Sequence, residues 1–221
     1  FGVDPEAQFG NEILVKLSSD QIKVLKMASM ISLPADESIF LSIRGATHED
    51  VIFLTSRMLL REYGDGKMDM HELLTGMIRA KLSEEEIEYY SSLAARHYAK
   101  RGGDEDTVQL LQFQRMSGDL EGLIRTLKEH GVNLIEKGYL SVKEIVHSLD
   151  LGKLDPEASS GIHLVLYQAA LVEGDEKTAE RDLARAAVLC AESLKRERTG
   201  DKMKLAATIL ARYAQLSGTA M

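Results

Sequence analysis

Tryptophan is absent from this sequence, and it contains only three prolines and one cysteine. Scarce proline leaves few forced breaks in helices, and the single Cys190 excludes an internal disulfide framework, which fits a reducing cytoplasm. No apolar run approaches the length that crosses a bilayer, and no basic-then-apolar leader is present. We therefore expect a helix-rich cytoplasmic protein with no segment in a membrane.

The residues that are abundant support the same fold class. The 221 residues are 44% hydrophobic, which suffices for a buried core, and Leu, Ala, Glu and Lys favour helix. Phe1 stands where a starting methionine would be, which indicates a piece of a longer protein or a trimmed chain. The net charge of −8 argues against a chain that coats nucleic acid, although it allows a local basic face.

The stretch from Leu59 to Leu74 changes character twice. An apolar, helix-spaced run ends at Leu60, a Gly64-Asp65-Gly66 turn follows, and helical spacing returns after Met70. Glycine at both ends of the turn is expected to supply the positive φ of a tight hairpin. Because a lone hairpin is marginally stable, it must pack on the helices around it.

Helix signals precede the hairpin. The segment from Pro5 to Leu17 reads as a first helix, and Ser18 with Gln21 has capping-box spacing for a second, which Pro34 stops. A short third helix is expected from Asp36 to Ile43, and Thr47 with Asp50 opens a fourth that carries Val51, Leu54, Met58 and Leu59. Residues 1–82 thus predict a winged-helix-like bundle, with the fourth helix at the recognition position.

Residues 83–221 predict a tetratricopeptide-like array of antiparallel helix pairs. Ser83 with Glu86 caps the first helix, and a glycine–aspartate pair then recurs at residues 103, 118, 174 and 200. Glycine suits the residue that ends a helix, and aspartate suits the cap of the next. The spacing is irregular, so the array is tetratricopeptide-like without a strict repeat. The stretch from Lys153 to Pro156 is either a joint between two helix groups or an ordinary interhelical loop.

Catalytic motifs are absent or broken. A P-loop needs Ser or Thr after Lys67, where Met68 stands, and glycine where Arg61 stands. The zinc-protease motif fails at Thr75, the six histidines show no ligand spacing, and no nucleophile elbow occurs. We expect no catalytic residue, no metal site and no enzyme activity in this chain.

One motif carries a family resemblance. Met70-His71-Glu72, followed by Leu73-Leu74, stands where the winged helix of STAND-class signal-transduction ATPases carries a Met-His-Asp motif. That class includes the NB-ARC proteins and the maltose-activator-like transcription regulators. Residues 10 to about 100 resemble the region after the ATPase core of these proteins. The segment Leu93–Ala99 is similar to the helix that opens the arm of the maltose-activator-like branch.

The resemblance implies a regulatory portion of a larger ATPase. His71 would contact the β-phosphate of ADP in the full-length parent and hold the closed, inactive state, while the helical array would serve as a sensor or bind a protein partner. Glu72 departs from the family aspartate, and the core that would bind ADP or ATP is not in this sequence. Alternatively, His71 caps its own helix or packs on the hairpin.

Two other functions remain open at this point. The chain could be a free-standing helical-repeat adaptor for protein–protein interaction, with a structural winged helix. It could also be a winged-helix transcription factor. A P-loop upstream of Phe1 in the full gene would separate the ATPase hypothesis from the adaptor hypothesis.

Charge argues against DNA binding by the winged helix. From residue 45 to residue 72 there are three cationic and six acidic side chains, a net charge of −3. We expect no shift of a random DNA duplex in a gel at moderate salt with protein at about micromolar concentration, because phosphate contacts need cations. Tight, salt-sensitive retention of the duplex would favour the transcription-factor hypothesis instead.

Overall fold

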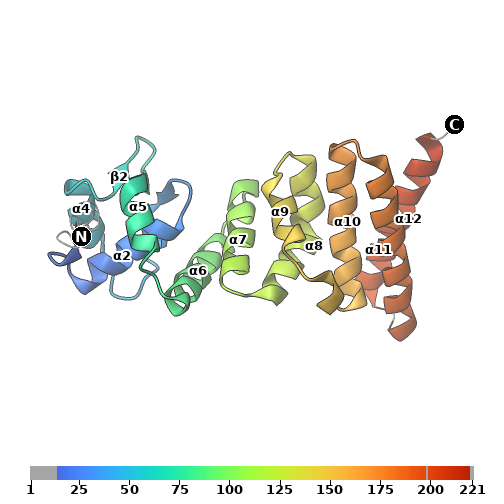
Figure 1. Ribbon diagram of the computed structural model, residues 1–221, viewed down its shortest axis with the longest axis horizontal. Coiled ribbons are helices and arrows are strands. Elements are labelled where there is room, and N and C mark those ends of the chain that lie inside the picture. Colours follow the sequence, from blue (N-terminus) through green and yellow to red (C-terminus); the bar gives the residue numbers. More distant parts are fainter. Residues whose placement is uncertain (1–13, 198, 220–221) are drawn as a thin grey trace, which may run out of the picture. The chain divides into compact units, whose positions relative to one another are not determined.

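The chain is mainly α-helical with one small antiparallel sheet, as predicted (Figure 1). A computed structural model describes residues 14–197 and 199–219, so most of the predicted first helix lies outside the described residues. The chain forms two compact units, Phe1–Lys100 with Met116–Gly118, and Arg101–Arg115 with Asp119–Met221. The units divide after Lys100, and the domain boundary after residue 82 stays a prediction.

The first unit consists of a helix, a strand, two helices and a hairpin, followed by two more helices; the strand before the hairpin was not predicted. These elements are α2 (Ser19–Met30), β1 (Ala35–Asp36), α3 (Glu37–Phe40), α4 (His48–Ser56), β2 (Arg61–Glu62), β3 (Lys67–Asp69), α5 (Glu72–Arg79) and α6 (Glu84–Tyr98). The strand order β1-β3-β2 places β3 at the centre of the sheet.

Helix α2 is the core of this unit. Its side chains Val24, Leu25 and Met27 are fully buried, and the helix packs against α4, α5 and α6. Its predicted capping box is confirmed, because the Ser18 hydroxyl accepts from the Gln21 backbone N–H at 3.1 Å. The capping boxes that begin α4 and α6 are confirmed as well.

The hairpin is present, and its turn uses one glycine where two were predicted. Gly66 has a φ of +77°, whereas Gly64 is not among the described glycines with positive φ. The turn closes with the Tyr63 backbone N–H donating to the Lys67 carbonyl at 2.8 Å. Across the two strands, Arg61 and Asp69 form a two-point ion pair at 2.8 and 3.0 Å. One positive φ and this cross-strand pair are enough to hold the turn.

Two predicted helices are shorter than their sequence patterns indicated. The third is preceded by strand β1, whose residues Ala35 and Asp36 pair with Met68 and Lys67 of β3. The fourth ends at Ser56, because Met58 adopts a left-handed conformation with a φ of +57° and closes the helix end. Met58 was predicted to lie on the fourth helix; it lies beyond the end of that helix and is 83% exposed.

The second unit is an array of helices joined by short turns. Its elements are α7 (Asp104–Met116), α8 (Leu120–Glu136), α9 (Ser141–His147), the 3-10 helix η1 (Leu151–Lys153), α10 (Pro156–Val172), α11 (Glu176–Arg196) and α12 (Gly200–Thr219). Contacts run along the chain, with α8 on α9 and α10, α10 on α11, and α11 on α12. Leu154 and Asp155 connect η1 to α10, and Asp155 caps α10 with Pro156 in its first turn, so the stretch from Lys153 to Pro156 is an ordinary interhelical connection inside one unit.

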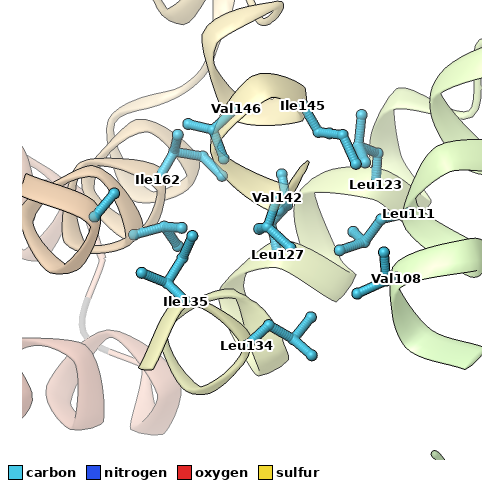
Figure 2. Close-up of a cluster of buried hydrophobic side chains, with 12 residues drawn as sticks. Val108, Leu111, Leu123, Leu127, Leu134, Ile135, Val142, Ile145, Val146 and Ile162 are labelled. Atoms are coloured by element: carbon cyan, nitrogen blue, oxygen red, sulfur yellow. The ribbon is translucent and has the colours of Figure 1, made fainter. Parts of the chain in front are cut away.

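Helix α10 belongs to both hydrophobic clusters of this unit. Ile162 and Val165 pack with apolar side chains of α7, α8 and α9, as Figure 2 shows for the first cluster. Leu164 and Tyr167 pack instead with side chains of α11 and with Ile209 of α12. Because α10 is buried on both of these sides, it is the central helix of the array.

We predicted that each glycine–aspartate pair ends one helix and caps the next, and this is confirmed at two of the four pairs. Gly118 and Gly174 have φ values of +72° and +75°, and the aspartates after them cap α8 and α11. Asp104 and Asp201 lie inside the first turns of α7 and α12 instead of capping them. Aspartate is favourable within a first turn as well as at the cap, so the sequence pattern does not separate the two.

Glycine allows α8 and α10 to approach closely. A Cβ on Gly131 would lie 2.8 Å from Cγ2 of the buried Val165. Alanine is about 1 kcal/mol better than glycine inside a helix, but overpacking costs about 1–3 kcal/mol. We therefore expect Gly131→Ala to lower the free energy of unfolding, measured in urea, by up to about 2 kcal/mol.

Val165→Ala provides the background that isolates this contact. With the valine methyl groups removed, adding Gly131→Ala should raise stability through helix propensity alone. If Gly131→Ala raised the free energy of unfolding in both the wild type and the Val165→Ala variant, the close contact between Gly131 and Val165 would not need glycine.

An ion pair between Lys26 and Glu86 joins α2 to α6. The hydrogen bond from Lys26 lowers the pKa of Glu86 below its ordinary value of 4.5, against the opposing effect of burial. A lowered folded-state pKa means that the pair stabilises the protein above about pH 4.5 and that this stability is lost as pH falls through the folded pKa. Glu86→Gln should therefore be less stable than wild type at pH 7, and the difference in denaturation midpoint should shrink below pH 4.5. A difference that is independent of pH would contradict this account.

Candidate functional site

The Met70-His71-Glu72 motif joins the hairpin to α5. Met70 is 5% exposed and anchors the junction in the core, whereas His71 is exposed and is the N-cap of the helix. The His71 Nδ1 accepts from the Leu73 backbone N–H at 3.3 Å. The Thr75 hydroxyl lies within hydrogen-bond distance of the carbonyls of Met70 and His71, at 3.3 and 3.2 Å. The junction is therefore held by its own helix, as the capping alternative expected.

This geometry determines what His71 can donate. Because Nδ1 is an acceptor, the neutral ring carries its proton on Nε2, which is its remaining donor. The ring also lies at the start of a helix, where backbone N–H groups and the helix dipole favour an anion. Glu72 brings a carboxylate into the same first turn and reduces that attraction. His71 can thus both cap α5 and donate one hydrogen bond to an anionic group.

The described residues contain neither a cluster of metal ligands nor a reactive cysteine. Residues 14–197 and 199–219 contain no group of three His, Cys, Asp or Glu side chains that could hold a metal ion. Burial raises the pKa of the Cys190 thiol, and the negative charge of Glu157 raises it further. Cys190 is therefore a poor source of thiolate at neutral pH.

In residues 45–72, each lysine or arginine lies close to a partner side chain. Arg61 pairs with Asp69, Lys67 lies 3.9 Å from Asp65, and the Arg57 guanidinium lies over the Phe53 ring at 5.3 Å. A hollow of about 510 Å³ between α4 and the hairpin has Glu37 and Glu62 in its lining, with Ile52 and Met68 as apolar members. These contacts strengthen the charge argument against a DNA-binding face.

A larger groove of about 720 Å³ runs along the second unit. Helix α10 forms its floor with Ala158, Gly161, Leu164, Tyr167 and Gln168, and helices α8 and α12 form the two walls. Lys128 of α8 pairs with Glu157 at the start of α10, and Gly131 lies against Val165 further along, so α8 and α10 run in the same direction. A Cβ on Gly161 would meet the Lys128 stem at 2.7 Å, so glycine is needed for that stem to lie over α10.

An ion pair spans the groove near the end of α8. Arg212 of α12 donates to Glu136 of α8 at 3.1 Å, over residues that are 76 positions apart. Burial raises the pKa of Tyr167, and the positive charge of Arg212 opposes this rise, which shows that the guanidinium lies near the phenol. At the beginning of the groove, four acidic side chains, Glu121, Asp155, Glu157 and Asp201, outnumber the three cations Arg125, Lys128 and Lys204, of which Lys128 pairs with Glu157 and Lys204 with Asp201.

Gln168 is the unusual side chain of the groove lining. It is 8% exposed, and its Oε1 has no hydrogen-bond partner among the described residues. A buried polar atom without a partner costs about 1–3 kcal/mol. Such an atom on the floor of a groove is a candidate contact for a ligand.

Sequence reasoning placed His71 correctly at the hairpin-to-helix junction and missed the groove entirely. Lys128, Gln168 and Arg212 lie on three helices, and no short motif links them. The available signal was glycine inside helices, at Gly131 and Gly161, which marks a close approach of another element.

Within the part of the chain that the structure describes, no helix is long and apolar enough to span a lipid bilayer.

Comparison with known proteins gives one structural likeness. No family model and no curated protein matches the sequence. The structure resembles the crystal structure of a Signal Transduction ATPase with Numerous Domains (STAND) protein with a tetratricopeptide repeat sensor from Pyrococcus horikoshii. The TM-score is 0.49 and the identity 14%, and the match covers 96% of this chain and 40% of that protein. The chain thus spans less than half the length of that protein.

Proposed function

We propose that this chain is a non-catalytic regulatory and sensor portion of a STAND-type ATPase. Its first unit is a winged helix that responds to the nucleotide state of an ATPase core, and its helical array binds a protein partner. The observation that supports this proposal is the position of His71. It caps α5 directly after the hairpin, is exposed, and keeps its Nε2–H as a donor.

In this proposal His71 recognises a phosphate of ADP that is bound by the core. An exposed imidazole donor at a helix start suits that group, because the helix dipole supports the same negative charge. ADP or ATP itself is held elsewhere, since this chain lacks a P-loop. Phosphate contact by His71 would favour the closed state, and its loss would release the nucleotide.

The alternative function is a protein–protein interaction adaptor in which the winged helix is only structural. The 720 Å³ groove of the second unit favours this alternative as much as it favours the sensor, because it can receive a partner in either case. The two proposals differ in whether a P-loop core belongs to the same protein. A full-length protein without a P-loop would leave the adaptor as the function.

The test is the rate of ADP release from the full-length parent. His71→Ala removes a hydrogen bond to a charged group, worth roughly 1.5–3 kcal/mol, so ADP should leave about tenfold to hundredfold faster. The same change in the present 221-residue chain should barely alter the melting temperature, because the ring is exposed and its capping bond is long.

His71→Ser is the matched control. Serine keeps an N-cap oxygen for the backbone of α5 but cannot reach a phosphate as the ring does. It should therefore release ADP as fast as His71→Ala while keeping the stability of wild type. If ADP release stayed at the wild-type rate in both variants, the nucleotide role of His71 would be wrong.

A further inference from the structure

The direction of the helices gives the groove of the second unit two different ends. Ser160 of α10 donates to the Ala186 carbonyl and His163 contacts Asp182, so α10 and α11 are antiparallel. Only residues 197–199 separate α11 from α12, which returns in the direction of α10. Helices α8, α10 and α12 therefore start at the same end of the groove, which is the acidic end. The Arg212–Glu136 ion pair crosses the groove towards the other end.

Between these ends the groove wall is apolar and only partly covered. Ile124 and Val132 of α8 and Leu205 of α12 line it and are half-buried, and Leu164 lies on the floor between them. Near the ion pair, Gln168 contributes its buried amide, whose Oε1 has no hydrogen-bond partner among the described residues. The Oε1 is covered, so contact with a donor requires a rotation of the amide about the terminal torsion of glutamine, which is broad.

The lining selects among ligand classes. A phosphate-bearing ligand needs several cations that are free of ion pairs. Lys128, Lys204 and Arg212 each lie beside an acid. Arg125 is then the one lining cation without an ion-pair partner among the described residues, and the five acidic side chains of the lining outnumber its four cations. A sugar ring needs an aromatic face to lie on, and the one aromatic residue of the lining, Tyr167, is 2% exposed. A polypeptide offers what the groove lacks: backbone N–H donors, apolar side chains and cationic side chains.

We propose that this groove binds an extended polypeptide segment of a partner protein. The segment donates a backbone N–H to the Oε1 of Gln168 and seats an apolar side chain on Ile124, Val132 and Leu205. A basic side chain of the segment points to the acidic end, where Glu121 and Asp201 lie. This inference rests on the proposed function, because it names the chemistry of the partner that the array binds.

Gln168→Leu separates binding from folding. Leucine fills a similar volume and removes a buried acceptor that has no partner, so the melting temperature should rise by about 2–4 °C. A polypeptide bound in the groove should lose its hydrogen bond and bind about tenfold more weakly. A merely structural glutamine would instead lower the melting temperature when replaced.

Gln109 offers a matched control. It is a buried glutamine of α7, 6% exposed, its Oε1 also has no partner among the described residues, and it does not line the groove. Gln109→Leu should raise the melting temperature in the same way and leave peptide affinity unchanged.

The experiment uses a random dodecapeptide library, selected on the 221-residue chain, followed by synthesis of a recovered peptide. Its dissociation constant is measured by fluorescence anisotropy for the wild type and for both leucine variants. N-methylation at each peptide bond in turn then identifies the N–H that is donated. At one position the methyl group should weaken binding to wild type about tenfold and have no further effect on Gln168→Leu.

The outcomes separate this inference from the proposed function. Peptides that bind equally well to wild type and Gln168→Leu would overturn the groove assignment while leaving a partner-binding array in place. Recovery of no peptide, or binding of inorganic phosphate or a neutral oligosaccharide in a manner sensitive to Gln168, would overturn the polypeptide class. ADP release from the parent tests the regulatory role independently of all these results.

Discussion

The burial of α10 is the constraint on which the second unit depends. A helix with apolar side chains on two opposite sides must be covered twice, and here α8 and α9 cover one side while α11 covers the other. The side that remains is the floor of the groove. The floor includes the small residues Ala158 and Gly161, and the absence of a side chain on Gly161 lets the Lys128 stem lie over α10. Core packing and the candidate binding surface therefore arise from the same helix.

Local signals in the sequence predicted most of the helix starts, because a cap is encoded within four residues. Ser18, Thr47 and Ser83 each cap a helix through a partner three residues later, as predicted. The failures lie where the determining contact is remote. Strand β1 exists because Ala35 pairs with Met68, far along the chain, and no local pattern announces that pairing.

The end of α4 failed for a different reason. Glycine is the usual sign of a left-handed residue after a helix, and here a methionine takes that conformation. The apolar run from Val51 to Leu60 continues past the true end at Ser56, so periodicity alone extended the helix too far. The backbone N–H groups of Leu59 and Leu60 both lie within hydrogen-bond distance of the Leu54 carbonyl, at 2.9 and 3.3 Å, and close the turn after the helix.

The two candidate sites differ in the same way. His71 could be placed from the sequence, since a hairpin turn and the following helical pattern surround it within a few residues. The groove could not be predicted from the sequence, because its lining comes from three helices that only the folded array brings together. A buried amide such as that of Gln168 also looks like an ordinary helix residue until its surroundings are known.

Strand β2 also affects the tendency of this protein to aggregate. It lies at the edge of the sheet, is two residues long, and consists of the exposed, charged Arg61 and Glu62. Long, flat and apolar sheet edges recruit further strands and lead to aggregation. An edge this short, with charge on both residues, offers almost no template for that process. This edge of the sheet is therefore a poor site for edge-to-edge aggregation.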